Sequence, residues 1–139
     1  MNTFSNIIIP TTVKKEVLFD SEKYSEANTI KKNFESKKLT EKKIQIKKIT
    51  KNLGQGESEA ISLADEEESL LITDDKLALN LAINRGVQVK TTETLLLILL
   101  KKKNLDFLTF IEKMNDLNKV KMLKPEIFQL ILKEAEKYK

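Results

Sequence analysis

The feature that most constrains this chain is a helix pattern that leads into a short apolar strand ending in two aspartates. The helix pattern follows Gly54, and Glu57 and Glu59 fall near its start. The strand pattern runs from Leu70 to Asp75. Carboxylates at a helix start and at a strand end are the parts from which a shallow pocket for a divalent cation is built. Such a pocket needs a further carboxylate, which Glu16 on an upstream helix could supply.

Short apolar runs alternate with helix patterns along the first 90 residues. We expect strands at 6–9, 70–73 and 87–90, the first closed by Pro10. This alternation predicts a three-layer α/β domain with a parallel sheet, helices on both faces and a helical C-terminus. Alternation of Ile44 and Ile46 with polar residues also predicts an exposed edge strand within 42–49.

Several helix boundaries are marked by single residues. Asp75 is expected to cap the start of a helix, and Gly86 is expected to follow the end of that helix as its C′ residue, in the left-handed conformation. Pro125 is expected at the first position of a later helix. No linker or repeat interrupts the 139 residues. We therefore expect a single domain over 1–139, with 93–139 as its helical part.

The composition narrows the chemistry. The chain has no Cys and no His, which excludes disulfide scaffolds, thiol catalysis, Ser-His-Asp triads and His-bound zinc. Any catalysis must therefore use carboxylates or lysines. Nine lysines lie between Lys31 and Lys51, whereas Glu57 to Glu68 holds six acids and no base. A basic segment beside an acidic one fits phosphate contacts next to a metal pocket, although two solvated faces would look the same.

The sequence shows no targeting or membrane segment. The start of the chain lacks a basic region followed by a long apolar run, and the longest apolar run, Leu95 to Leu100, is far below the ~20 residues of a spanning helix. We expect a soluble, cytoplasmic protein with no membrane contact.

Several motifs, in one order, resemble the PIN domain, and specifically a PIN-like branch found in bacteria and archaea. They are Ile-Ile-Ile-Pro-x-x-Val-x-x-Glu-Val (7–17), Leu-Gly-x-Gly-Glu-x-Glu-Ala-Ile-x-Leu-Ala (53–64), Leu-Leu-Ile-Thr-Asp-Asp-Lys (70–76) and Gly-Val-x-Val (86–89). The resemblance covers nearly the whole chain.

PIN domains are single-strand ribonucleases, many of them toxins held by an antitoxin, and they use one or two Mg²⁺ or Mn²⁺ ions in a carboxylate cluster. By position, the resemblance implies that Glu16, Glu59 and Asp75 are the catalytic residues and metal ligands, with Asp74 and Glu57 as neighbouring ligands. It also implies single-stranded RNA and an antitoxin-like protein as partners.

The family opens with a strand that ends in Asp-Thr or Asp-Ser, before the Ile-Pro strand. Here Pro10 lies close to the first residue of the sequence, so we expect this first strand and its metal-binding Asp to be missing. Cleavage should then be weak or absent. The alternatives are a non-catalytic module that binds RNA or protein, and a subunit that needs a partner strand. An unfilled sheet edge also predicts a homodimer or a higher oligomer, or binding of a partner.

Each acidic residue has a structural interpretation as well. Glu16 could be a solvated helix position, Glu57 a first-turn residue favoured by the helix dipole, and Asp74 and Asp75 helix caps. The metal interpretation rests on their joint order.

Overall fold

Helices and short strands alternate as far as Lys90, and only helices follow. The structure is a computed structural model that describes residues 6–19, 25–46 and 49–139. These residues form two compact units, one within Phe4–Val89 and the other over Lys90–Lys139. The boundary lies close to position 93, where the sequence analysis begins the helical part. Assignment of both units to a single domain stays a prediction.

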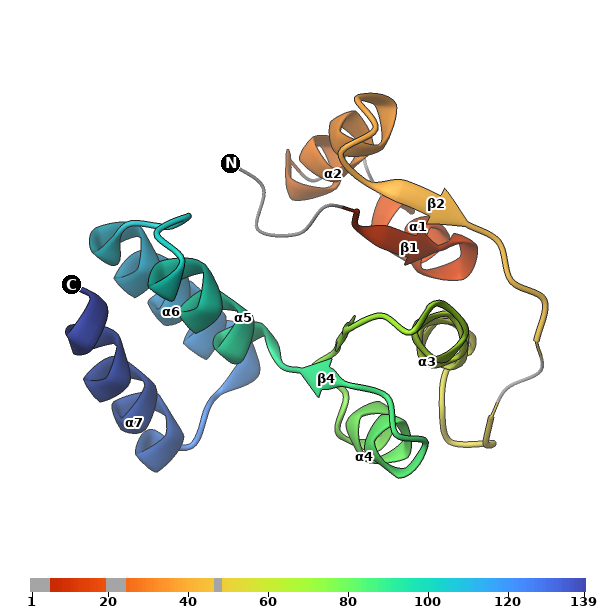
Figure 1. The fold of residues 1–139 in the computed structure, drawn as a ribbon. Coiled ribbons are helices and arrows are strands. Elements are labelled where there is room, and N and C mark those ends of the chain that lie inside the picture. Colours follow the sequence, from red (N-terminus) through yellow and green to blue (C-terminus); the bar gives the residue numbers. More distant parts are fainter. Residues whose placement is uncertain (1–5, 20–24, 47–48) are drawn as a thin grey trace. The chain divides into compact units, whose positions relative to one another are not determined.

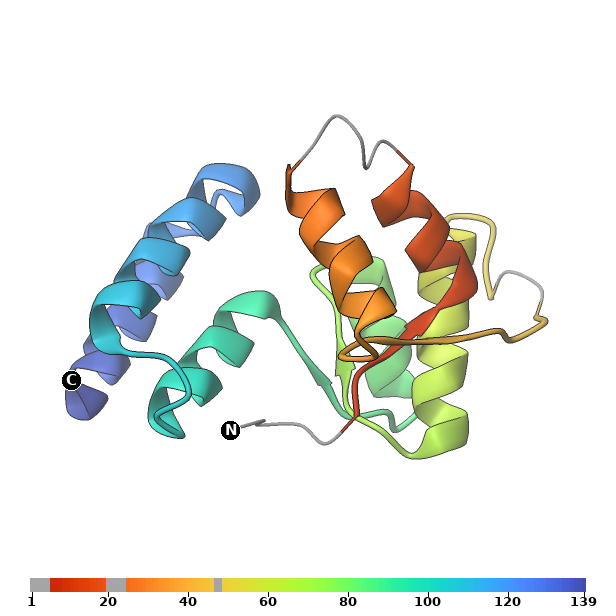
Figure 2. The same ribbon diagram turned by 90° about the horizontal axis from the view of Figure 1, so that it is seen from above.

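The first unit begins with β1 (Ile8–Pro10), followed directly by α1 (Thr11–Leu18). Next come α2 (Ser25–Glu35) and β2 (Thr40–Lys42). β1 and β2 pair in parallel, with Ile8 opposite Thr40 and Pro10 opposite Lys42. The helices α1 and α2 pack side by side (Figure 2). A strand, a helical connection and a second, parallel strand make up the expected α/β unit.

The rest of this unit is built around α3 (Gln55–Glu67), which contacts both β1 and α1 (Figure 1). It leads to β3 (Leu71–Ile72), α4 (Lys76–Asn84) and β4 (Val89–Lys90). The Leu71 amide donates to the Gln88 carbonyl at 2.8 Å, next to the point where β3 and β4 pair. The core is aliphatic and consists of Leu53, Ile61, Ala64, Leu71, Ala78, Ala82 and Val87.

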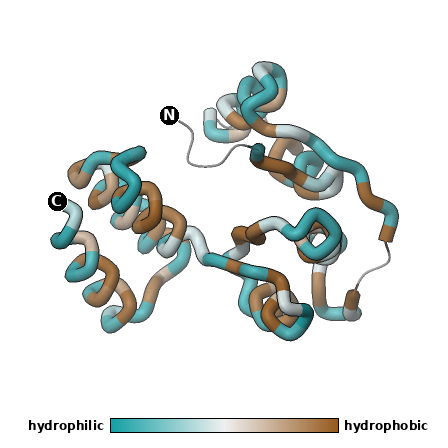
Figure 3. Tube along the Cα trace, in the orientation of Figure 1, coloured by the Kyte–Doolittle hydropathy of each residue, from teal (hydrophilic) through white to brown (hydrophobic). Residues whose placement is uncertain are grey.

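The second unit contains α5 (Thr92–Lys101), α6 (Phe107–Lys121), α7 (Pro125–Ala135) and a short 3₁₀ helix (Glu136–Tyr138). Its core consists of Leu100, Phe110, Met114 and Ala135. The hydropathy colouring shows a nearly continuous apolar stretch along α5, whereas apolar and polar residues alternate along α6 and α7 (Figure 3). Pro125 occupies a first-turn position of α7, as expected.

The mixed α/β fold class is confirmed, but the sheet differs from the prediction. Strands occur at each of the three expected places, yet the described strands form two separate two-stranded sheets, β1–β2 and β3–β4, instead of one. The edge strand predicted within 42–49 is also wrong in position, because β2 ends at Lys42 and residues 43–46 form no strand. The position of β2 is set by its pairing with β1, and not by the alternation of two isoleucines with polar residues. Part of that range, 47–48, lies outside the described residues.

None of the helices in the part of the chain that the structure describes has the length and apolar character required to cross a membrane.

Candidate functional site

Two of the predicted site residues lie along the contact between α1 and α3. Gly56, in the first turn of α3, faces α1 so closely that a Cβ atom there would lie 3.1 Å from Glu16 Oε1 and 3.1 Å from Val13 Cγ2. Glu59, one turn after Gly56 in α3, meets Thr12, which lies one turn before Glu16 in α1. Glycine thus permits a close approach of the two helices, and this approach brings Glu16 and Glu59 to the same interface.

Glu59 is the most enclosed acidic residue of this region, with an exposed fraction of 4%. Its Oε2 accepts hydrogen bonds from Thr12 Oγ1 at 2.5 Å and from Gln55 Nε2 at 3.0 Å. Its Oε1 accepts from the Thr12 amide at 3.4 Å. The start of α1 has Pro10 as its N-cap residue and no side-chain cap of its own. Glu59 therefore provides, from α3, the carboxylate that a helix start normally takes from a neighbouring residue.

The remaining predicted ligands occupy helix starts. The Asp75 carboxylate accepts from the Ala78 amide at 2.8 Å and caps α4, as predicted, and Gly86 ends this helix region with φ +76°. Asp74 precedes Asp75 and also has an interaction partner. Glu57 lies in the first turn of α3, where its carboxylate folds over Gly54. The structural roles expected for Asp75 and Glu57 are thus present.

A magnesium or manganese ion needs several oxygen ligands at one point. Within residues 6–19, 25–46 and 49–139, no three Asp or Glu side chains are grouped closely enough to hold an ion. Both oxygens of Glu59 are also already engaged as acceptors. By themselves, the described residues do not fit a metal centre.

Two ion pairs between lysine and glutamate lie around α1. Lys14 Nζ lies 2.9 Å from Glu41 Oε1, and Lys42 forms an ion pair with Glu67. The hydrogen bond from Lys14 holds the pKa of the Glu41 carboxyl below its usual value. These contacts tie α1 to β2 and β2 to the end of α3, so the basic segment also has a structural role.

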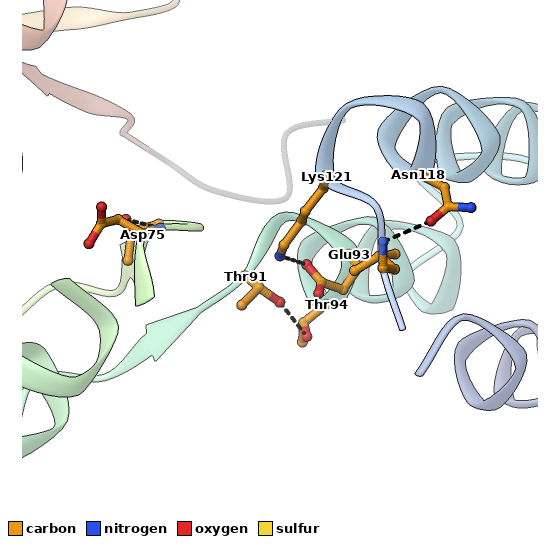
Figure 4. Close-up of polar contacts among 8 residues, drawn as sticks. Asp75, Thr91, Glu93, Thr94, Asn118 and Lys121 are labelled. Atoms are coloured by element: carbon orange, nitrogen blue, oxygen red, sulfur yellow. Dashed lines mark hydrogen bonds and ion pairs between the residues drawn. The ribbon is translucent and has the colours of Figure 1, made fainter. Parts of the chain in front are cut away.

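The second unit contains a polar cluster that the sequence analysis did not predict (Figure 4). Glu93, in the first turn of α5, has an exposed fraction of 7% and lies 2.5 Å from Lys121 Nζ at the end of α6. Asn118 Oδ1 accepts from the Leu123 amide at 2.9 Å. Thr91 and Thr94 place their hydroxyls 3.1 Å apart. These contacts tie α5 to α6 and stabilise both helix ends.

Thr12 and Gln55, the donors that hold Glu59, were not predicted from the sequence. Gln55 lies four residues before Glu59, a spacing at which side chains on a helix meet, so this contact had a local signal. Thr12 lies 47 positions away and had none.

Comparison with protein families matches residues 1–137 to a family described as a PIN domain. Comparisons with curated proteins and with solved structures find no match. The family match covers nearly the whole chain and agrees with the mixed α/β fold and with the order of the motifs. The chain belongs to the PIN domain family.

Proposed function

We propose that this protein is a PIN-like module related to metal-dependent single-strand ribonucleases, and that it binds Mg²⁺ or Mn²⁺ weakly and cleaves RNA slowly or not at all. The residues proposed for the metal are Glu16, Glu59 and Asp75, with Asp74 and Glu57 beside them. Family membership supports this assignment. So does the α1–α3 contact, where Glu16 and Glu59 border one interface.

The low activity is proposed mainly from the surroundings of Glu59. Its carboxylate accepts three hydrogen bonds, from the Thr12 amide, the Thr12 hydroxyl and Gln55. Coordination of an ion would have to compete with these donors, and a buried donor left without a partner costs about 1–3 kcal/mol. An enclosed carboxylate engaged in this way is a poor ligand for an ion that needs several free oxygens.

The same observation favours a second candidate, a non-catalytic PIN-like module that binds RNA or a protein. In that case Glu59 serves to hold α1 in place, and the chain presents a surface instead of a reaction centre. A toxin role with an antitoxin-like partner belongs to the first candidate and follows from the family alone.

An RNA cleavage assay with single-stranded RNA and Mn²⁺ separates these candidates from an active nuclease. We expect slow or absent cleavage by the natural chain, and Asp75→Asn should remove whatever slow cleavage there is. Asparagine keeps an oxygen acceptor for the Ala78 amide, so the variant removes the charge without removing the cap. Asp106→Asn is the matched control, because Asp106 caps α6 in the same way in the second unit.

Brisk manganese-dependent cleavage that Asp75→Asn abolishes and Asp106→Asn preserves would contradict the proposal. It would mean that the three carboxylates suffice for catalysis.

A further inference from the structure

The strand β1 has one backbone edge that no other strand of the described residues covers. In the parallel pair of β1 and β2, Ile8 lies opposite Thr40, and the Thr40 amide donates to the Ile7 carbonyl at 2.9 Å. Along an extended strand, the N–H and C=O of one residue point to the same side, and successive residues alternate between the two sides. Ile7 and Ile9 therefore face β2, whereas the N–H and C=O of Ile8 face away from it.

The strand β3 has a comparable edge. The Leu71 amide donates to the Gln88 carbonyl at 2.8 Å, so Leu71 faces β4. Ile72, the next residue, turns its N–H and C=O to the opposite side. Backbone polar groups that are removed from water need a hydrogen-bonding partner. Ile8 and Ile72 thus mark two strand edges at which further pairing can take place.

Charged residues are distributed unevenly over the four strands. β2 (Thr-Glu-Lys) and β4 (Val-Lys) contain charged residues, whereas β1 (Ile-Ile-Pro) and β3 (Leu-Ile) contain none. Charges on an edge strand, lysine above all, hinder its pairing with another chain. β2 and β4 are therefore protected in the way that is usual for exposed edges. The uncharged sequences of β1 and β3 are typical of strands inside a sheet.

One helix lies against both uncharged strands. α3 contacts β1 and also contacts β3. An α-helix with its side chains is about 10–12 Å across. Neighbouring strands lie about 4.8 Å apart, so two strands that flank one further strand are separated by roughly 10 Å. The helix α3 is thus wide enough to cover β1, β3 and one strand between them.

We propose that an extended segment of a different polypeptide inserts between β1 and β3 and pairs with the edges at Ile8 and Ile72. The segment that fits is a short run of consecutive apolar, β-branched residues, because strands inside a parallel sheet are apolar on both faces. A second copy of this chain fits less well. An inserted strand uses both of its edges, and each described strand already uses one edge in its own sheet. This inference does not depend on cleavage of RNA.

The first test measures amide hydrogen exchange of the full chain by NMR. In the free chain, the amides of Ile8 and Ile72 should exchange fast, and that of Ile9, which faces β2, should exchange slowly. The probe is a synthetic peptide, Ser-Lys-Val-Ile-Val-Ile-Lys-Ser. We expect it to slow exchange at Ile8 and Ile72 by about tenfold or more. The same peptide with N-methylated valines keeps its side chains but lacks the donors of one edge, and it should give no protection.

The second test measures binding of the fluorescein-labelled peptide by fluorescence anisotropy. Ile8→Pro removes the N–H that faces away from β2, a position at which an edge strand tolerates proline. We expect about tenfold weaker binding, the effect of one lost hydrogen bond. The matched control is Val89→Pro. The Gln88 carbonyl faces β3, so the Val89 N–H points away from β3, and its loss should leave peptide binding unchanged. Circular dichroism verifies that both variants are folded.

Three results would overturn the proposal. They are unchanged exchange at Ile8 and Ile72 with saturating peptide, equal protection by the N-methylated peptide, and equal weakening by the two proline variants. Protection that grows with protein concentration in the absence of peptide would assign the two edges to a second copy, and it would overturn the choice of a different polypeptide.

Discussion

Glu59 joins two segments that lie 47 positions apart in the chain, and its hydrogen bonds show how a residue of a family motif can have a structural role. The carboxylate is enclosed, which is costly for a charge unless donors surround it. Thr12 and Gln55 provide those donors. The contact also positions the start of α1, the helix that carries Glu16 and Lys15. Stability and site geometry are therefore coupled at this residue.

We predict that Glu59 and Thr12 are energetically coupled in the absence of divalent metal. Glu59→Gln turns an amide NH₂ toward existing donors, and Thr12→Val removes the hydroxyl while keeping its shape. Each change should lower the free energy of unfolding by about 1–3 kcal/mol. The double variant should lose less than the sum, by roughly 0.5–3 kcal/mol. Urea unfolding in EDTA measures all three.

Glu57→Gln is the control for this cycle, because Glu57 lies in the same helix turn but folds over Gly54 instead of α1. Its effect should stay within about 0.5 kcal/mol. Strictly additive losses from Glu59→Gln and Thr12→Val would show that the bond contributes nothing as a pair.

At the scale of elements, α4 is a helix whose two ends are fixed by local chemistry. Asp75 accepts from the Ala78 amide, and Gly86 takes a positive φ that other residues adopt only with strain. Ala78 and Ala82 then place the inner face of the helix in the core. The cap and the apolar face together fix where α4 begins and which side it buries.

We predict that the cap at Asp75 depends on an oxygen acceptor and not on charge. Asp75→Ala should lower the free energy of unfolding by about 1 kcal/mol, whereas Asp75→Asn should change it by only a few tenths. Thermal or urea unfolding of the two variants measures the difference. An equal loss in both would mean that the carboxylate charge itself stabilises the start of α4.

Elements with local signals were predictable from the sequence. The cap at Asp75, the left-handed Gly86 and the start of α7 at Pro125 are confirmed because each depends on residues within one turn. The position of β2 was not predictable, since it depends on pairing with β1 some thirty residues earlier.

The candidate site was predictable only in part. The motif order led to the family, which is confirmed, and it led to Glu16, Glu59 and Asp75 as candidates. The sequence did not reveal that Glu59 would be enclosed by Thr12 and Gln55, because enclosure depends on how closely α1 approaches α3. Use of these acids as metal ligands stays a prediction.

At the scale of the whole molecule, the strands have few partners. In the two sheets formed by the described residues, each strand pairs with only one other strand. Two-stranded sheets are marginally stable, and strand edges in soluble proteins are normally covered, charged or paired. Large apolar side chains are also exposed on the second unit, including Leu108, Val120 and Met122 at 81–85% and Leu130 at 63%. Both features favour association of the chain with another protein surface, either a second copy or a partner.

We therefore predict that the chain forms a homodimer or a higher oligomer, or binds a partner. Light scattering at micromolar concentration should give a mass above the 16.0 kDa of one chain. Leu130→Glu should lower that mass if the apolar side of α7 contributes, because a charge buried in an interface is unfavourable. Gln129→Glu adds the same charge at the neighbouring exposed position and should leave the mass unchanged. A mass near 16.0 kDa, with cooperative unfolding and no partner present, would show that the exposed edges and apolar residues are tolerated in a monomer.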